Sequence, residues 1–141
     1  MTAGRPRVVF DCNLFLQAAI SSGGPAAACM DLVDQGTITL VISPDVLAEA
    51  RDVLTRPKLT RKFATLTPER VEQFLSDVEA RAEMVNDVPR TIELPRDPKD
   101  EPYINLAIAS GARYLVTRDK DLLDLMADEA LRQQAPDLTI L

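Results

Sequence analysis

The stretch Asp97–Asp121, DPKDEPYINLAIASGARYLVTRDKD, constrains the fold more than any other part of this chain. It begins with two aspartates three residues apart, continues through an Ala-rich apolar segment and a short hydrophobic run, and ends with two more aspartates. This pattern is typical of a helix followed by a buried strand, with acidic side chains at both ends. It predicts half of an α/β active site. Whether the carboxylates hold a metal ion or only cap helices depends on what the rest of the chain supplies.

The whole chain alternates short apolar runs with helical patterns. Cap and proline signals start helices at Pro25, after Ser43 and after Thr67, and a further apolar helix is expected at Leu14–Ile20. Strands are predicted at Val8–Phe10, Ile38–Ile42, Tyr114–Thr117 and Leu138–Leu141, with a short strand and loop inside Met84–Leu94. The alternation predicts an α/β fold with an open, mostly parallel sheet and helices on both faces, as a single domain over residues 1–141. Ligands in such sheets bind beyond the carboxyl ends of the strands, where the strand order reverses.

Composition excludes several kinds of site. The chain has two cysteines, Cys12 and Cys29, and no histidine, so neither a disulfide framework nor a Cys/His zinc site is expected. Any metal ion must be held by oxygen. The apolar run near the N-terminus is too short for a signal peptide or a membrane span, so we expect a cytoplasmic protein that does not contact a membrane.

The formal net charge of −6, from 16 basic and 22 acidic residues, argues against broad electrostatic capture of nucleic acid. A local basic groove is still compatible with that charge. One basic patch is a candidate for phosphate binding, formed by Arg51, Arg56, Lys58, Arg61 and Lys62. The alternative is a solvated helix end and loop.

Four acidic residues are predicted to point toward one edge of the sheet: Asp11, Glu49, Asp100 and Asp119. Capping of the following helices accounts for Asp100 and Asp119 as well as catalysis does, and Asp97 fits a turn before Pro98. Capping does not account for Asp11 or Glu49. Glu49 lies at the border of an apolar helix face, so its carboxylate points either to solvent or into a cleft.

Convergence of these acids requires a counterion. Two carboxylates about 4 Å apart repel by about 4 kcal/mol at an effective dielectric near 20, and a bound cation reverses the sign. Oxygen ligands without nitrogen or sulfur partners favour Mg²⁺ or Mn²⁺. Such an ion activates water and neutralises charge on a phosphate, so the predicted chemistry is phosphodiester hydrolysis.

The chain resembles the PIN-domain proteins, in particular the compact bacterial toxin components of toxin–antitoxin systems, the VapC-like ribonucleases. The matching segments span nearly the whole chain and read VVFDCN, SPDVLAEARDVLTRPK, DPKDEPYINLAIASGARYLVTRD and DKDLL. The resemblance implies a three-layer α/β/α sandwich and an endoribonuclease that depends on Mg²⁺ or Mn²⁺.

The resemblance also assigns roles to residues of this chain. Asp11, Glu49, Asp100 and Asp119 match the family's acidic quartet, and Asp121 matches an additional metal ligand. Supporting positions are matched by Asn13, a polar residue beside the site, and by the hydroxyl residues Ser43 and Thr117. Cys12 departs from the pattern, because the family usually has a small hydroxyl residue there. Since cysteine is similar in size, we expect lost hydrogen bonding and a retained site, with reduced activity as a further consequence.

Three functions remain open at this point. The first is the ribonuclease, with RNA as substrate and the basic patch guiding its backbone. The second is a PIN-fold module with weak catalysis that acts through a protein or RNA partner. The third, an aspartyl-phosphate phosphatase, lacks the second acid it needs, because Asn13 stands two residues after Asp11. The resemblance further implies an antitoxin partner and a homodimer, for which the helices at Leu14–Ile20 and Val71–Val78 offer apolar faces unless these belong to the core.

Overall fold

The computed structural model describes residues 5–95 and 98–141, which form an α/β sandwich around one parallel sheet. The five strands have the order β3-β2-β1-β4-β5, and every pairing is parallel. Their bounds are β1 Arg7–Phe10, β2 Thr39–Ile42, β3 Glu83–Met84, β4 Tyr114–Val116 and β5 Thr139–Ile140. The predicted parallel α/β fold is confirmed.

The strand order reverses beside β1. From β1 the chain moves outward to β2 and β3 on one side, then returns to place β4 and β5 on the other. In the register of the sheet, Val8 lies opposite Leu40 of β2 on one side and opposite Tyr114 of β4 on the other. The crevice between the carboxyl ends of β1 and β4 is therefore the position at which a doubly wound sheet binds its ligand.

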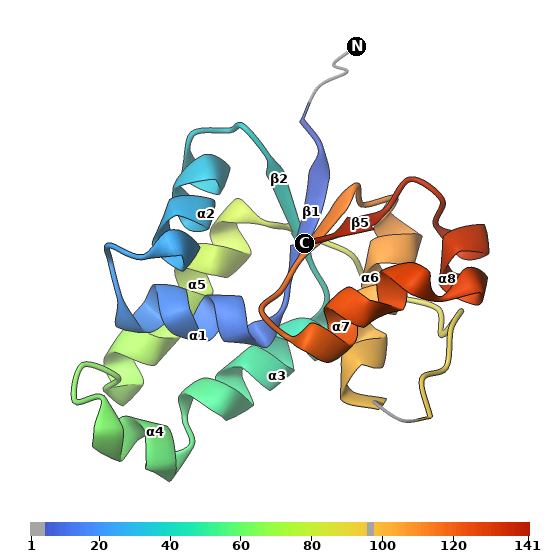
Figure 1. The fold of residues 1–141 in the computed structure, drawn as a ribbon. Helices are drawn as coiled ribbons and strands as arrows, with labels where there is room; N and C mark the ends of the chain where they lie inside the picture. Colours follow the sequence, from blue (N-terminus) through green and yellow to red (C-terminus); the bar gives the residue numbers. More distant parts are fainter. Residues whose placement is uncertain (1–4, 96–97) are drawn as a thin grey trace.

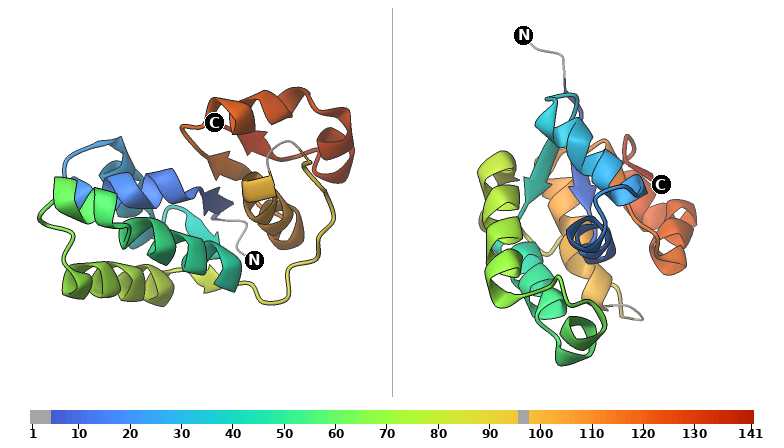
Figure 2. Two further views of the ribbon diagram at one scale, coloured as in Figure 1. Left: turned by 90° about the horizontal axis from the view of Figure 1, so that it is seen from below. Right: turned by 90° about the vertical axis from the view of Figure 1, so that its left-hand side faces the viewer.

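The helices divide between the two sides of the central strands. The helices α1 to α5 gather on one side and α6 to α8 on the other, as the blue-to-green and the orange-to-red ribbons show (Figures 1 and 2). The helical bounds are α1 Cys12–Ile20, α2 Pro25–Asp34, α3 Pro44–Leu54, α4 Pro57–Lys62, α5 Pro68–Arg81, α6 Glu101–Ser110, α7 Lys120–Asp124 and α8 Glu129–Gln134, with 3₁₀ turns η1 Pro98–Asp100 and η2 Leu125–Ala127.

The hydrophobic core fixes the sheet against α6. This helix is buried along most of its length and contacts β1, β2 and β4. Within it, Tyr103, Ile104 and Leu106 are almost fully excluded from solvent. A helix buried on nearly every side leaves little freedom in its position, so the residue at its N-terminus, Asp100, is held in a defined place relative to β1 and β4.

Most predicted helix starts are confirmed. Ser43 and Thr67 cap α3 and α5 by accepting hydrogen bonds from backbone N–H groups, and a proline follows each of them. The prediction for α1 was wrong by two residues: the helix begins at Cys12 because Asp11 caps it. β4 ends at Val116, which leaves Thr117 outside the strand.

The region predicted as a short strand and loop, Met84–Leu94, contains strand structure only at its first residue, since β3 covers Glu83–Met84. The remainder is irregular and is held by side chains of α6 instead of by strand pairing. Asp97, predicted to form a turn, lies outside the described residues. Within the ranges that the structure describes, no helix is long and apolar enough to cross a membrane.

Gly111 ends α6 in the left-handed conformation, with φ of 67°, and lets the chain turn into β4. We predict that Gly111→Ala lowers the free energy of unfolding by about 1–2 kcal/mol, because an L side chain is strained at this φ even though no atom lies within 4 Å of the added Cβ. Gly23→Ala is the matched control, since its Cβ also meets nothing within 4 Å and it has no positive φ. Equal urea midpoints for the two variants would contradict this interpretation.

Candidate active site

A hydrogen bond between Asp11 and Thr117 joins the carboxyl ends of β1 and β4 at the strand-order reversal. Asp11 follows β1 directly and Thr117 follows β4 directly, and the Thr117 hydroxyl donates to Asp11 Oδ2. The other carboxylate oxygen of Asp11 accepts from the Leu14 backbone N–H at 3.1 Å. Both side chains are buried, so the carboxylate has one orientation, set by both strands and by the first turn of α1.

Thr117 also positions the second acidic residue. Its hydroxyl oxygen accepts from the Asp119 backbone N–H at 2.9 Å. Asp119 Oδ1 in turn accepts from the Asp121 backbone N–H at 2.8 Å, which caps α7. Asp121 is exposed and contributes its backbone to this chain of bonds. Its expected role as an additional metal ligand stays a prediction.

Glu49 reaches the same region from α3. Its side chain is half-buried, and Oε1 accepts a hydrogen bond from the Cys12 thiol at 3.5 Å. The Glu49 carboxylate therefore contacts the first turn of α1 and is not fully solvated. The expectation that Cys12 loses its hydrogen bonding was wrong, because its thiol donates to Glu49, although a thiol is a weak donor.

The hydroxyl of Tyr103 is buried beside this group. The Tyr103 side chain is almost fully excluded from solvent, and among the described residues its oxygen has no hydrogen-bond partner of good geometry. Burial raises the pKa of Tyr103, and the nearby Cys12, Glu49 and Asp11 raise it further. The Cys12 thiol interacts with this hydroxyl, so the cost of burying it is partly offset by a group of the site itself. Sequence reasoning missed Tyr103 because it reads as one of the apolar residues of α6.

The acids influence one another's protonation. Burial is the main cause that raises the pKa of Asp11 above its ordinary 3.8, and the nearby Asp119 raises it further, while the hydrogen bonds from Thr117, Leu14 and Asn13 oppose the rise. Burial also raises the pKa of the Cys12 thiol to about 11, with Glu49 and Asp11 adding to the effect. Burial and the neighbouring acids therefore both favour the protonated forms of Asp11 and Cys12.

Asp100 stands at the cap position of α6, but its side chain makes no capping hydrogen bond to that helix, although the residue does interact with its surroundings. The capping hypothesis thus fails for Asp100. For Asp11 the opposite correction applies: capping was judged unable to account for Asp11, yet this residue caps α1. A short polar side chain at a strand end that directly precedes a helix is well placed for both roles.

Two buried polar residues beside Asp100 were missed by sequence reasoning. Glu101 accepts from Arg90 Nε at 2.7 Å and from the Leu94 N–H at 2.9 Å. Asn105 makes paired hydrogen bonds with the backbone of Ile92, at 2.8 and 3.0 Å. Together they tie the irregular segment before η1 to α6 and so support the position of Asp100. Their spacing of four residues on one helix face was the available signal.

The donor chemistry fits a hard divalent cation, although the side chains are not arranged as a closed set of ligands. Within residues 5–95 and 98–141, no group of three or more Asp, Glu or Cys side chains lies close enough to hold a metal ion. Asp11, Glu49 and Asp119 nonetheless supply only carboxylate oxygens, which suit Mg²⁺ or Mn²⁺. The buried Tyr103 hydroxyl adds a position at which a water of a hydrated ion finds a partner.

The remaining predicted supporting residues lie in separate places. Ser43 is buried and its hydroxyl accepts from the Val46 N–H at 3.2 Å, so the structure shows it as a helix cap. Asn13 is exposed in the first turn of α1, and its contact with Asp11 is through the backbone N–H.

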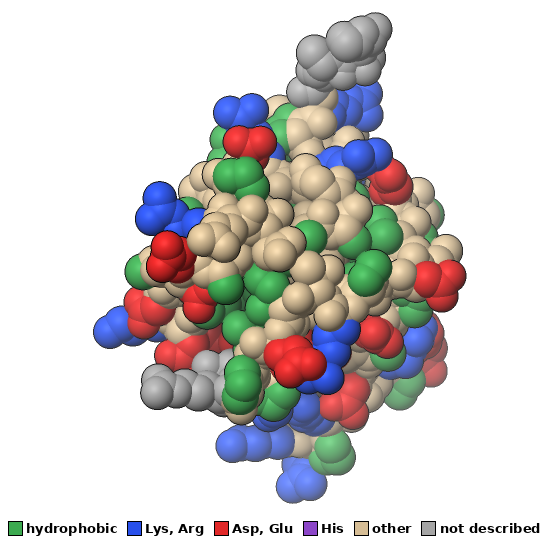
Figure 3. Space-filling view, turned by 90° about the vertical axis from the view of Figure 1, so that its right-hand side faces the viewer, with side chains coloured by type: hydrophobic (Ala, Val, Ile, Leu, Met, Phe, Trp, Pro, Cys, Tyr) green, Lys and Arg blue, Asp and Glu red, His purple; other side chains and the backbone are tan. Residues whose placement is uncertain are grey.

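The predicted basic patch is reduced by ion pairs. Arg51 pairs with Glu72 and Arg56 with Asp52, each at 3.0 Å. The other three residues form no salt bridge with the described part of the chain and lie exposed on α4: Lys58, Arg61 and Lys62. On the face over α6 to α8, acidic and basic side chains are interspersed and do not form a field of one sign (Figure 3). The α4 cluster is thus the part of the predicted patch that is available for phosphates.

The apolar faces considered for a homodimer belong to the core. Leu14 and Phe15 of α1 and Val71, Leu75 and Val78 of α5 are buried. The large exposed hydrophobic residues among those described are Leu32, Leu123 and Leu141. The core alternative is therefore confirmed for these two helices, and homodimerisation stays a prediction without a surface assigned to it.

The fold is a parallel α/β sandwich with carboxylates at the strand-order reversal, an arrangement found in many ligand-binding and catalytic α/β domains. Comparison with known proteins identifies the family within this class. Residues 7–121 match the PIN domain family. The chain is 31% identical over 120 residues to the uncharacterized protein MJ1680 of Methanocaldococcus jannaschii, over 84% of this chain and 74% of the relative. The chain belongs to the PIN-domain family, and membership supports a nuclease, a hydrolase of phosphodiester bonds.

A solved structure shares the fold. It is VapBC2 from Rickettsia felis bound to a DNA fragment from their promoter, with a TM-score of 0.59 and 18% identity over 96% of this chain and 97% of that chain. At this identity the likeness shows the α/β/α fold expected from the sequence.

The burial of Asp11 leads to a prediction about pH. Because its pKa is raised in the folded protein, its contribution to stability is complete below about pH 4 and is lost as the pH rises through the folded pKa. Asp11→Asn keeps a good cap for α1 and removes the titration. The measurement is the free energy of unfolding of the wild type minus that of Asp11→Asn, in the presence of chelator. This difference should decrease as the pH is raised from acidic to neutral. A difference that is the same at both ends of that range would contradict the assigned cause.

Proposed function

We propose that this protein is a divalent-metal-dependent endoribonuclease that hydrolyses RNA phosphodiester bonds. The observation that carries the proposal is the buried Asp11–Thr117 hydrogen bond at the strand-order reversal, which fixes one carboxylate and leads through Thr117 to Asp119. Glu49 and Tyr103 approach the same point from α3 and α6. Family membership supports the reaction class, and the choice of Mg²⁺ or Mn²⁺ and of RNA is proposed here.

In this mechanism Asp11, Glu49, Asp100 and Asp119 are the residues that would hold the cation, with Asp121 as an additional candidate. When bound, Mg²⁺ or Mn²⁺ supplies a water of lowered pKa and neutralises the charge that develops on the phosphate. Thr117 and the Leu14 N–H hold the Asp11 carboxylate in one orientation, so little reorganisation is needed there during reaction. The Cys12 thiol donates only to Glu49 Oε1, so Oε2 is the oxygen with which Glu49 would hold the cation or its water.

The RNA backbone would be guided locally. With a net charge of −6, the protein as a whole repels a polyanion, so attraction depends on the exposed cations of α4. Lys58, Arg61 and Lys62 are the candidates, because Arg51 and Arg56 already pair with acids. Few phosphate contacts imply weak binding with a shallow dependence on salt.

One observation favours a second function, a PIN-fold binding module with weak catalysis that acts through a protein or RNA partner. Among the residues that the structure describes, the acidic side chains do not form a closed ligand set, and Glu49 accepts a hydrogen bond from the Cys12 thiol. Calorimetric titration with Mn²⁺ separates the two functions: absence of binding at millimolar concentration would support the module.

We predict that the pure protein cleaves defined single-stranded RNAs with Mg²⁺ or Mn²⁺ and not with chelator. Asp11→Asn and Glu49→Gln should each lower the cleavage rate by more than the roughly 10–100-fold that loss of an outer partner of a metal ligand costs. Asp31→Asn and Glu79→Gln are matched controls, because both residues are exposed on helices that do not supply the site.

Two results would overturn the assignment. One is full activity in a folded Asp11→Asn variant, with contaminating nuclease excluded by the same purification of an unrelated protein. The other is equal cleavage by the wild type with and without chelator.

We also propose that the protein acts in the cytoplasm as the toxin of a toxin–antitoxin system, with a cognate antitoxin as partner. The fold shared with VapBC2 supports this role. Expression of the wild type in a bacterial host should slow growth, and expression of Asp11→Asn to the same level should not, because the toxic effect requires cleavage. Growth inhibition of equal size by both forms would show that the effect does not come from the nuclease site.

A further inference from the structure

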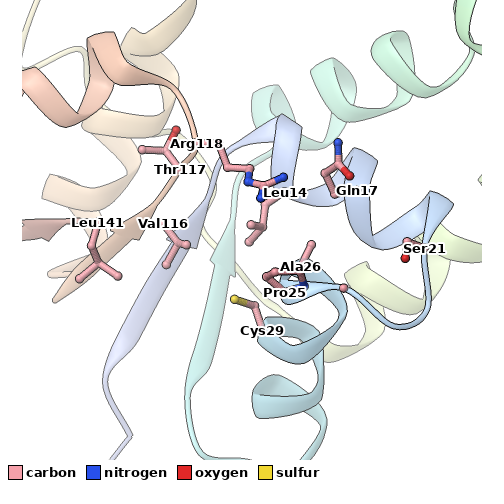
Figure 4. A pocket seen from close by; sticks show the side chains of 11 residues that line it. Leu14, Gln17, Ser21, Pro25, Ala26, Cys29, Val116, Thr117, Arg118 and Leu141 are labelled. Atoms are coloured by element: carbon pink, nitrogen blue, oxygen red, sulfur yellow. The ribbon is translucent and has the colours of Figure 1, made fainter.

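A cavity of about 240 Å³ lies between α1, α2 and the segment that follows β4. Its wall is mainly apolar, with Leu14, Ala26, Val116 and Leu141 among the lining residues. The Cys29 sulfur faces it from α2, and Gln17 and Arg118 are also among the lining residues (Figure 4). Neither the proposed catalytic acids nor the basic cluster of α4 accounts for this feature.

The cavity adjoins the proposed catalytic centre through one residue. Thr117 lines the cavity and also bonds to Asp11 and to the Asp119 backbone. The segment Thr117–Asp119 therefore supplies a hydroxyl and a carboxylate to the site and a guanidinium to the cavity. A group in the cavity would lie immediately beside a phosphate held at Asp11 and Asp119.

The size and lining of the cavity favour a single flat ring system. Its volume is below the roughly 300–1,000 Å³ of pockets for drug-sized ligands. Apolar walls suit the faces of a ring, and the Arg118 guanidinium offers donors to a ring edge. Resting on the proposed nuclease function, we propose that this cavity receives the nucleobase of the RNA residue next to the scissile phosphate and selects that base.

Arg118 is the residue that best distinguishes a nucleobase from a purely apolar occupant. It is exposed and forms no salt bridge with residues 5–95 or 98–141. Its side chain extends from the segment after β4 across the mouth of the cavity toward Leu14 (Figure 4). A guanidinium plane stacks on bases and donates to their edges and to phosphates, so an unpaired arginine here suits a charged, aromatic ligand.

The first arm of the test measures base preference. Wild-type protein is given a pool of oligoribonucleotides randomised around one position, and the cleaved ends are sequenced. The wild type should prefer one base or base class at the position that adjoins the cut. Cys29→Phe, which fills the cavity, and Arg118→Ala should lower that preference at least about fivefold, the size expected for loss of one base contact.

Leu32→Phe is the matched control. It adds the same ring to the same helix, at an exposed position outside the lining of the cavity, and should keep the wild-type preference. Thermal unfolding shows whether Cys29→Phe is folded. Arg118→Ala changes an exposed side chain and so decides the matter if Cys29→Phe does not fold.

The second arm does not require cleavage. Binding of a short oligoribonucleotide to the Asp11→Asn protein is compared with binding of the same strand carrying one abasic residue at each position in turn. One abasic position should weaken binding at least about fivefold. The same position should have no effect when Cys29→Phe or Arg118→Ala is added.

The outcomes separate this proposal from the nuclease function. Cleavage without base preference, or with a preference that a folded Cys29→Phe and Arg118→Ala both retain, would overturn the base pocket and leave the nuclease intact. Absence of cleavage together with one abasic-sensitive position would overturn the nuclease and support the pocket. Uniform binding of all abasic strands, or no RNA binding, would overturn the pocket and leave an apolar side chain of a protein partner as its occupant.

Discussion

The hydrogen bond from Thr117 to Asp11 is the interaction on which the arrangement of the site depends. It connects β1 to β4, the two strands between which the order of the sheet reverses. It holds a buried carboxylate whose pKa is raised by burial, and it passes through Thr117 to the backbone of Asp119. The Asp11 backbone N–H also donates to the Val116 carbonyl at 3.2 Å, so the strand pairing sets the positions of the two residues and the side-chain bond sets the orientation of the carboxylate.

The surroundings of this bond explain why a buried acid is tolerated. Asp11 receives hydrogen bonds at both oxygens and caps α1, so part of the cost of its burial is offset by local contacts. Within residues 5–95 and 98–141, no basic side chain forms a salt bridge with Asp11, Glu49 or Asp119. The proposed divalent cation would offset the charge of Asp11 and Asp119 when both are ionised.

Sequence patterns predicted the fold well because the relevant signals are local. Short apolar runs marked β1, β2 and β4, and Ser43 and Thr67 followed by proline marked helix starts that the structure shows. β3 could not be placed in the same way, since two paired residues leave no periodicity to read. The extent of α1 was wrong because Asp11 was interpreted only as a candidate ligand, although it also caps the helix.

The sequence predicted the acidic residues of the candidate site but not the residues that hold them in position. Asp11, Glu49 and Asp119 could be proposed from their positions after strands or on a helix face, and the structure brings Glu49 to Cys12 and Asp119 to Thr117. Three further residues could not be proposed from the sequence, because their roles depend on contacts with segments far away in the sequence: Tyr103, Glu101 and Asn105. The base pocket likewise requires α1, α2 and the segment after β4 to be placed in three dimensions.

The central claim is that Asp11 and Asp119 form one cation site across β1 and β4. The most direct measurement is a crystal structure of the wild type grown with Mn²⁺, with the metal located by anomalous scattering. The account predicts a Mn²⁺ peak between these two carboxylates, at the direct coordination distance of slightly more than about 2 Å from an oxygen of each. An ordered site occupied elsewhere, with no anomalous density between Asp11 and Asp119, would contradict it.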